Sequence, residues 1–214
     1  MLKKARGKAA GLALILALAG CSSDGDSGDT GGGAGGASGG ASGASAAAAP
    51  LNPSQLAQAI PGKLAAPEGW KGREPRVLNG GEAQKHCQLA ARFSCAGLTG
   101  MANTQISASY DTDVKFELLA YDSVENAKAG MKTLVADTRE GAKADTLKPL
   151  TIDVGADETD AYAKENRTNA ALRVGTVVAF VIGSSLPKDH DLHSFASMQV
   201  QRITTAAAGK NPDA

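Results

Sequence analysis

Two apolar runs of period two, on either side of a short polar segment, constrain the fold of this chain more than any other feature. Apolar residues recur at every second position over 106–110 and again over 114–120, and the polar segment 111–113 joins the two runs. Successive side chains of a β-strand point to opposite faces, so this pattern predicts a β-hairpin with one buried face. The side chains expected on that face are Ile106, Ala108, Tyr110, Val114, Phe116, Leu118 and Ala120.

Helices are predicted over four segments: 54–60, 81–91, from Ser123 towards Gly141, and 190–206. In the third segment, apolar residues fall at offsets of 0, 3, 7, 10 and 11, which places them on one face of a helix. Asp122 or Ser123 can act as the N-cap of this helix, and Gly141 is a typical stop. We expect the apolar stripe to face the sheet.

Further strands are predicted at 150–154, 160–165, 172–174 and 177–182. The pair Gly175-Thr176 suits a two-residue type II′ hairpin turn between the last two strands. Both faces of the last strand are apolar, which indicates a central position in the sheet. Hairpin connections imply an antiparallel sheet. The sequence therefore predicts an α+β fold in two layers, with about five to six strands and three to four helices packed on one face.

The N-terminal 20 residues have the layout of a secretory signal peptide. Four basic residues lie within residues 3–8, and residues 9–20 are uninterruptedly small or apolar. A membrane-spanning helix needs about 20 apolar residues, so a spanning helix is not expected. Leu18-Ala19-Gly20-Cys21 resembles the lipobox of bacterial lipoproteins. That resemblance implies cleavage before Cys21, which becomes the mature N-terminus, and a diacylglyceryl group on its thiol, with palmitate among the chains. The alternative is a chance cysteine after an ordinary signal peptide.

The segment after Cys21 is almost entirely Gly, Ala and Ser, from residue 22 to residue 49. Such a segment buries too little apolar surface to fold, and as a random coil it spans about 30 Å. The predicted organisation is therefore a signal peptide (1–20), a lipidated cysteine with a disordered tether (21–49), a single α+β domain (50–207) and a frayed tail (208–214). We expect the domain to be anchored to the cell membrane on its extracytoplasmic side.

The charge balance bears on the class of partner. The chain contains 22 basic and 22 acidic residues, and four of the basic ones lie in the leader, so the mature chain is mildly acidic. Nucleic-acid binding calls for a basic surface, and no nucleic-acid partner is expected.

Cys87 and Cys95 are the two cysteines left when Cys21 carries lipid. An exported protein with one remaining pair favours a disulfide, although free thiols are the alternative. A continuous helix would place their Cα atoms about 12 Å apart, beyond the limit of about 7 Å for a bridge. We therefore expect the chain to turn between them, near residues 92–94.

Several of these features together resemble one family. They are the lipobox, the tether, the cysteine pair before the first hairpin, the turn Gly155-Ala156-Asp157-Glu158, the hairpin over 173–178 and the closing amphipathic helix. Over residues 51–206 the chain resembles actinobacterial lipoproteins related to the extracellular sensor-like domain of mycobacterial PknH-type kinases. The resemblance implies an extracytoplasmic module with an antiparallel sheet, helices and a ligand-binding cleft, and it carries over no catalytic residue. The kinase domains are expected to hold two disulfides, whereas this chain has cysteines for one.

Three groups of residues are candidates for metal-binding or catalytic sites. His190 and His193 lie three apart at a helix start and could bind a metal with a third ligand, but a solvated helix cap is the preferred interpretation. The acidic residues Asp153, Asp157, Glu158 and Asp160 lack the order of a calcium loop and fit a surface turn. Ser184 or Ser185 with a histidine could form a hydrolase, yet no nucleophile-elbow motif is present. No metal or cofactor is expected.

The sequence thus predicts a lipid-anchored, non-enzymatic, sensor-like module that binds a small apolar or cell-envelope ligand, or an envelope protein. The alternative is a cell-envelope hydrolase that uses Ser184 or Ser185 with His190 or His193.

Overall fold

An antiparallel sheet of eight strands forms the centre of the fold in the computed structural model, which describes residues 49–140 and 146–214. The strands run in the order β1-β3-β4-β8-β7-β6-β5, and β2 also pairs with β3. Their bounds are β1 Lys71–Gly72, β2 Arg76–Asn79, β3 Leu98–Ser107, β4 Asp113–Tyr121, β5 Lys148–Leu150, β6 Glu158–Lys164, β7 Arg167–Val174 and β8 Val177–Ser184. The predicted α+β class with an antiparallel sheet is confirmed.

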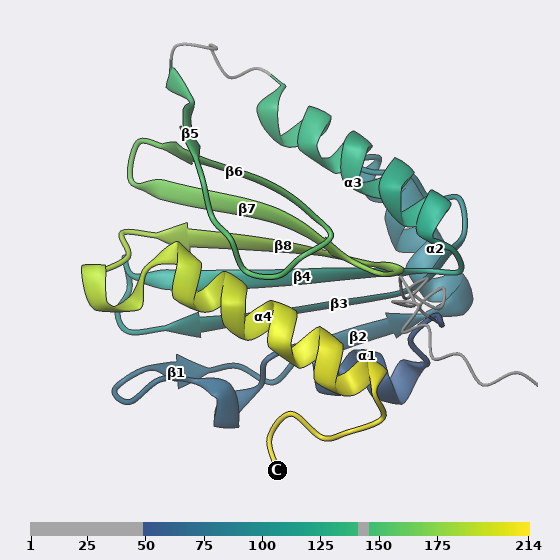
Figure 1. The fold of residues 1–214 in the computed structure, drawn as a ribbon, viewed down its shortest axis with the longest axis horizontal. Coiled ribbons are helices and arrows are strands. Elements are labelled where there is room, and N and C mark those ends of the chain that lie inside the picture. Colours follow the sequence, from purple (N-terminus) through teal and green to yellow (C-terminus); the bar gives the residue numbers. More distant parts are fainter. Residues whose placement is uncertain (1–48, 141–145) are drawn as a thin grey trace, which may run out of the picture. The chain divides into compact units, whose positions relative to one another are not determined.

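The described helices are α1 Pro53–Ala59, α2 Gly80–Ala90, α3 Val124–Arg139 and α4 Leu192–Ala207, with short 3-10 turns η1 Lys63–Ala65 and η3 Lys188–His190. Figure 1 shows α4 lying across the near side of the strands. All described residues belong to one compact unit. None of the helices within residues 49–140 and 146–214 is long and apolar enough to cross a membrane.

The helices cover both faces of the sheet, whereas the sequence predicted that they pack on one. Helices α1 and α4 pack on one face, against Phe116, Val181 and their neighbours. Helices α2 and α3 pack on the opposite face, against Leu119, Val178 and Phe180. The physical reason is that the inner halves of β4 and β8 are apolar on both faces, so each face must be shielded from water.

The sheet also has eight strands instead of the predicted five to six. The two additional edge strands, β1 and β2, both pair with β3 in a stretch that has no alternating pattern. They form because the outer edge of β3 offers backbone groups at residues 100–103 and 106–107, and the two edge strands satisfy them.

The predicted hairpin is formed by β3 and β4, with Ile106 opposite Val114 and Thr104 opposite Phe116. Tyr110, however, lies in the turn beyond the strands and is 98% exposed instead of buried. The turn spans residues 108–112, and Ala108 donates a backbone hydrogen bond to Thr112 at 3.0 Å. Pairing therefore ends three residues earlier than the pattern suggests.

Caps define the helix ends. Asn52 caps α1 and forms a capping box with Gln55, and Ser123, one of the two predicted candidates, caps α3. Asp191 caps α4, which begins two residues later than predicted. The predicted stop of α3 at Gly141 lies outside the described residues.

The segment 208–214, predicted to be frayed, folds back against α4. Arg202, which is buried, donates to both carboxylate oxygens of Asp213, with Nη2 2.9 Å from Oδ2. The same guanidinium donates to the carbonyl oxygens of Gln58 and Ile60 at the end of α1. Arg202 therefore joins α1, α4 and the segment after α4 because a buried guanidinium needs several acceptors.

Candidate functional site

A polar groove lies where α2 and α3 leave part of their face of the sheet uncovered. It has a volume of about 480 Å³, and its base comprises Phe180 and Ile182 of β8. Its sides come from β3, β4, the β1–β2 connection and the segment after α2. The polar side chains that line it are Arg73, Glu74, Arg92, Asn103, Gln105, Lys115 and Glu117.

A second depression of about 630 Å³ continues the groove towards the end of the sheet. The two share Arg73, Gln105 and Lys115. The turn between β3 and β4, the turn between β6 and β7 and the end of β8 meet there, and Figure 1 shows these connections at one end of the sheet. They contribute Ser107, Ser109, Tyr110, Asp111, Asp113, Asn166, Arg167 and Ser184.

Strand alternation places the polar side chains of the groove on one face. On β3 they are Asn103, Gln105 and Ser107, and each is paired in register with Glu117, Lys115 or Asp113 of β4. The residues between them point to the opposite face, where Ile106 and Val114 are fully buried. The alternation that buries one side of the hairpin therefore presents its polar side to the groove.

Arg92 forms ion pairs with two carboxylates at the inner end of the groove. Its Nη1 lies 3.6 Å from Oε2 of Glu117, and its Nε donates to Oδ2 of Asp137 at 3.2 Å. Burial raises the pKa of the Glu117 carboxyl, while the charges of Arg92 and His86 act in the opposite direction. Glu117 is therefore a poorly hydrated carboxyl that depends on a single ion pair.

The position of Arg92 follows from the disulfide. Cys87 at the last turn of α2 is bonded to Cys95, with Cα atoms 5.9 Å apart, which confirms the predicted bridge and the turn between the cysteines. Ala91 ends α2 in the left-handed region with φ 53°. Ser94 is hydrogen-bonded both to the sheet and to α3: Tyr121 Oη of β4 donates to its carbonyl oxygen, and its amide donates to Thr133 Oγ1 of α3. The short connection carrying Arg92 is thus fixed to the sheet and to α3.

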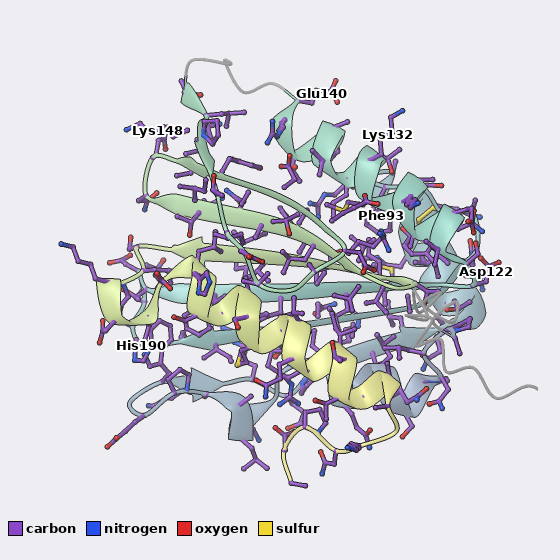
Figure 2. The ribbon with its side chains drawn as sticks, in the orientation of Figure 1. Phe93, Asp122, Lys132, Glu140, Lys148 and His190 are labelled. Atoms are coloured by element: carbon purple, nitrogen blue, oxygen red, sulfur yellow. A yellow bond between two sulfur atoms is a disulfide. The ribbon has the colours of Figure 1, made fainter. Side chains whose placement is uncertain are left out.

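The residues considered for hydrolysis are not brought together. Ser184 lies on the groove face, opposite Asp113, whereas His190 packs edge-on against Trp70, with ring centroids 5.6 Å apart, on the α4 side of the sheet. Figure 2 shows His190 near the start of α4. His193 Nε2 lies 3.1 Å from the carbonyl oxygen of Asp153, and Ser185 Oγ accepts from Asn166. Within the described residues, no hydrogen bond joins either serine to either histidine.

The acidic cluster forms ion pairs within the fold. Buried Arg173 donates to Asp157 at 2.8 Å and to Glu158 at 3.1 Å, and Arg139 of α3 donates to both oxygens of Asp160. These carboxylates hold the turn before β6 and attach α3 to the sheet. In the part of the chain that the structure describes, no group of three or more His, Cys, Asp or Glu side chains has the geometry of a metal site.

Cys21 lies outside the described residues, so its lipidation stays a prediction. Five residues of the groove were not predicted from the sequence as site residues: Arg73, Arg92, Gln105, Lys115 and Glu117. The polar positions 105, 115 and 117 were visible as the solvent side of the hairpin. No sequence pattern predicted that Arg92 belongs to the site, because its approach to Glu117 depends on the path of the disulfide-bonded turn.

No family model matches the sequence, and no curated protein matches it. Among solved structures, the chain is similar to the extracellular domain of PknH from Mycobacterium tuberculosis, with 14% sequence identity and a TM-score of 0.48. The match covers 76% of this chain and 100% of that one.

Proposed function

We propose that this chain is a lipid-anchored, extracytoplasmic, non-enzymatic module that binds its ligand in the groove on the α2–α3 face of the sheet. The groove is the observation that carries the proposal. Its volume lies within the range of about 300–1,000 Å³ that is typical of ligand sites, and it combines a small apolar base with many polar groups.

Three cations at the groove are available to a ligand. Arg73, Lys115 and Arg167 are exposed, and within the described residues none of their three side chains takes part in an ion pair or a hydrogen bond. Because these side chains have no internal partner, their charges and donors are accessible to a bound ligand.

The proposed location follows from the sequence and the disulfide together. The predicted leader ends just before Cys21, and disulfides such as Cys87–Cys95 persist in oxidising compartments outside the cytoplasm. Two acyl chains on Cys21 would hold the protein stably at the membrane. The tether of residues 22–49 would let the domain reach about 30 Å from the bilayer.

The polar lining favours a polar envelope ligand over the small apolar one. It also gives no support to the hydrolase alternative, because the sheet lies between Ser184 and His190. Nothing in the groove pairs a nucleophile with a base.

A thermal-shift measurement on the purified full chain tests the proposal. An extract of the cell envelope is expected to raise the melting temperature of the wild-type protein, because a ligand that binds only the folded state stabilises it. The groove variant Lys115→Glu is expected to lose the shift. The control Lys128→Glu, at an exposed position on α3, is expected to keep it. An equal shift in all three proteins, or none in any, would contradict binding in the groove.

A further inference from the structure

We infer that the ligand of the groove is an extended polyanion, a chain that carries repeated phosphate or carboxylate groups; the inference rests on the proposed function and assigns its ligand class. Three features of the groove point to this class: the pairing of its acidic side chains, the line along which its unpaired cations lie and the distance between those cations.

Two of the four acidic side chains that line the groove are paired with cations of the fold. Oε2 of Glu117 lies 3.6 Å from Nη1 of Arg92, and Oε2 of Glu74 lies 3.4 Å from Nζ of Lys63. A charge that is neutralised by an internal partner contributes little to the field that a ligand meets. These two carboxylates therefore do not offset the free cations of the groove.

The remaining acidic side chains lie at the outer end of the groove. Asp113 is half-buried and accepts a hydrogen bond from Nε2 of Gln105, and Asp111 is exposed in the β3–β4 turn. A third acid, Glu165, is exposed in the adjoining β6–β7 turn. In the part of the chain that the structure describes, none of these three acids belongs to an ion pair.

The cations at this end of the groove are unpaired. Arg73, Lys115 and Arg167 are exposed, and their side chains have no hydrogen-bond or ion-pair partner among the described residues. Guanidinium groups donate in a fork that matches the oxygens of phosphate and carboxylate, and an ammonium adds a compact positive charge. These three side chains can therefore bind anionic groups without breaking any contact of the fold.

Strand register places two further lysines on the same face. Lys71 of β1 lies opposite Ser107, and Lys164 of β6 lies opposite Arg167. Residues directly opposite each other in an antiparallel pair point to the same face of the sheet. Neither lysine forms an ion pair with another described residue. This end of the sheet thus carries five unpaired cations against the three acids.

Composition does not account for this excess of cations. The chain contains 22 basic and 22 acidic residues, and four of the basic ones lie in the predicted leader, so the remainder is mildly acidic. A protein with that balance that nevertheless gathers unpaired cations along one groove attracts anions to that groove.

The separation of the cations requires several anionic groups. The amide of Arg73 donates to the carbonyl oxygen of Gln105 at 2.9 Å, and Gln105 is paired with Lys115. Strand spacing therefore places the Cα atoms of Arg73 and Lys115 about 10 Å apart, and those of Lys115 and Arg167 about 12 Å apart. Side chains stand roughly perpendicular to a sheet, so one phosphate or carboxylate cannot pair with all three cations. A chain with charges along its length can.

Isothermal titration of the purified full chain, in an uncharged detergent, tests the inference. The polyanions are linear polyphosphate and hexagalacturonate, the single anions are inorganic phosphate and glycerol phosphate, and maltohexaose is the neutral probe. At least one polyanion is expected to bind the wild-type protein at least about tenfold more tightly than either single anion does. The binding is expected to weaken as the salt concentration rises.

Single substitutions should change the affinity in opposite directions. Arg73→Met, Lys115→Met and Arg167→Met are each expected to weaken binding of the polyanion about two- to fivefold, because each removes one exposed ion pair. Asp111→Asn is expected to strengthen it, because a like charge is removed from the groove. Lys128→Met, at an exposed position on α3, is the control and should leave the affinity unchanged.

The outcomes separate the ligand class from the proposed function. Binding of only one of the two polyanions supports the inference and assigns the charged group as phosphate or carboxylate. Inorganic phosphate binding as tightly as either polyanion would overturn the extended ligand. The inference alone fails if maltohexaose binds through Lys115 and neither polyanion does, or if no probe binds although envelope extract still raises the melting temperature through Lys115. A polyanion that binds equally to the wild type and to the three cation variants would contradict binding in the groove itself.

Discussion

Arg92 reaches Glu117 across the inner end of the groove, with Nη1 3.6 Å from Oε2. The two residues are 25 positions apart, and the disulfide-bonded turn after α2 brings them together. This pair links the stability of the fold to the geometry of the proposed site.

Removing the disulfide is expected to destabilise the domain. Closing the short loop between Cys87 and Cys95 contributes about 2.6 kcal/mol on the chain-entropy estimate, so the variant with both cysteines changed to Ser loses about that much free energy of unfolding. Urea unfolding of the wild type and the variant measures the difference. Identical midpoints would show that the bridge contributes nothing.

Glu117→Gln is expected to stabilise the protein at neutral pH. The folded state holds the pKa of Glu117 above its ordinary value, so the stability linked to its protonated form is present at low pH and is lost as the pH rises through the folded pKa. The glutamine keeps the uncharged state at every pH, and Arg92 retains Asp137. The free energy of unfolding should be measured for both proteins from pH 3 to pH 8. That of the variant should rise relative to that of the wild type as the pH rises.

The matched control for that series is Glu68→Gln, at an exposed position in the loop before β1. It should leave the pH dependence unchanged. A Glu117→Gln protein that is less stable than the wild type at pH 7 would mean that the ion pair with Arg92 outweighs the cost of burial.

Asp213→Asn is expected to destabilise the domain by about 2 kcal/mol at pH 7, because buried Arg202 loses its charged acceptor. Hydrogen bonding by Arg202 lowers the pKa of Asp213, so its contribution is present at neutral pH and is lost as the pH falls through the folded pKa. The difference between the two proteins should therefore shrink in acid. Asp189→Asn, at an exposed position in η3, is the control, and an equal effect of both substitutions would rule out the role given to Arg202.

Cys21 is expected to carry the anchor. Mass spectrometry of the exported protein should find Cys21 as the first residue, with acyl chains attached, and Cys21→Ala should move the protein from the membrane fraction to the soluble one. Ser22→Ala is the neighbouring control and should stay with the membrane. An unmodified Cys21 thiol would remove the basis for the proposed location.

The local parts of the fold could be predicted from the sequence. Alternation over 106–120 predicted the central hairpin, Gly175-Thr176 predicted the β7–β8 turn, and the cysteine spacing predicted a turn before the bridge. The distribution of helices over both faces of the sheet could not be predicted in this way. The apolar stripe of a helix such as α3 shows that the helix packs on the sheet, but it does not determine on which of the two faces. Edge strands β1 and β2 have no alternating apolar pattern in the sequence. Their short pairings with β3 are made by backbone hydrogen bonds, which do not depend on the side chains.

The candidate site was less predictable than the fold. Its polar residues occupy the solvent side of strands, where any polar side chain satisfies the pattern. The convergence of Arg73, Arg92 and Arg167 depends on three connections that are distant in sequence. Tyr110 was predicted on the buried face. It is exposed because the pairing of β3 with β4 ends at Ser107, so Tyr110 lies in the turn.

Hydrogen exchange with mass spectrometry tests binding in the groove most directly. The full chain is compared with and without envelope extract. Binding in the groove is expected to slow exchange in the segments that border it, 73–75, 108–112 and 165–167, with no change in α4. Slower exchange confined to α1 and α4, or no change in any segment, would contradict it.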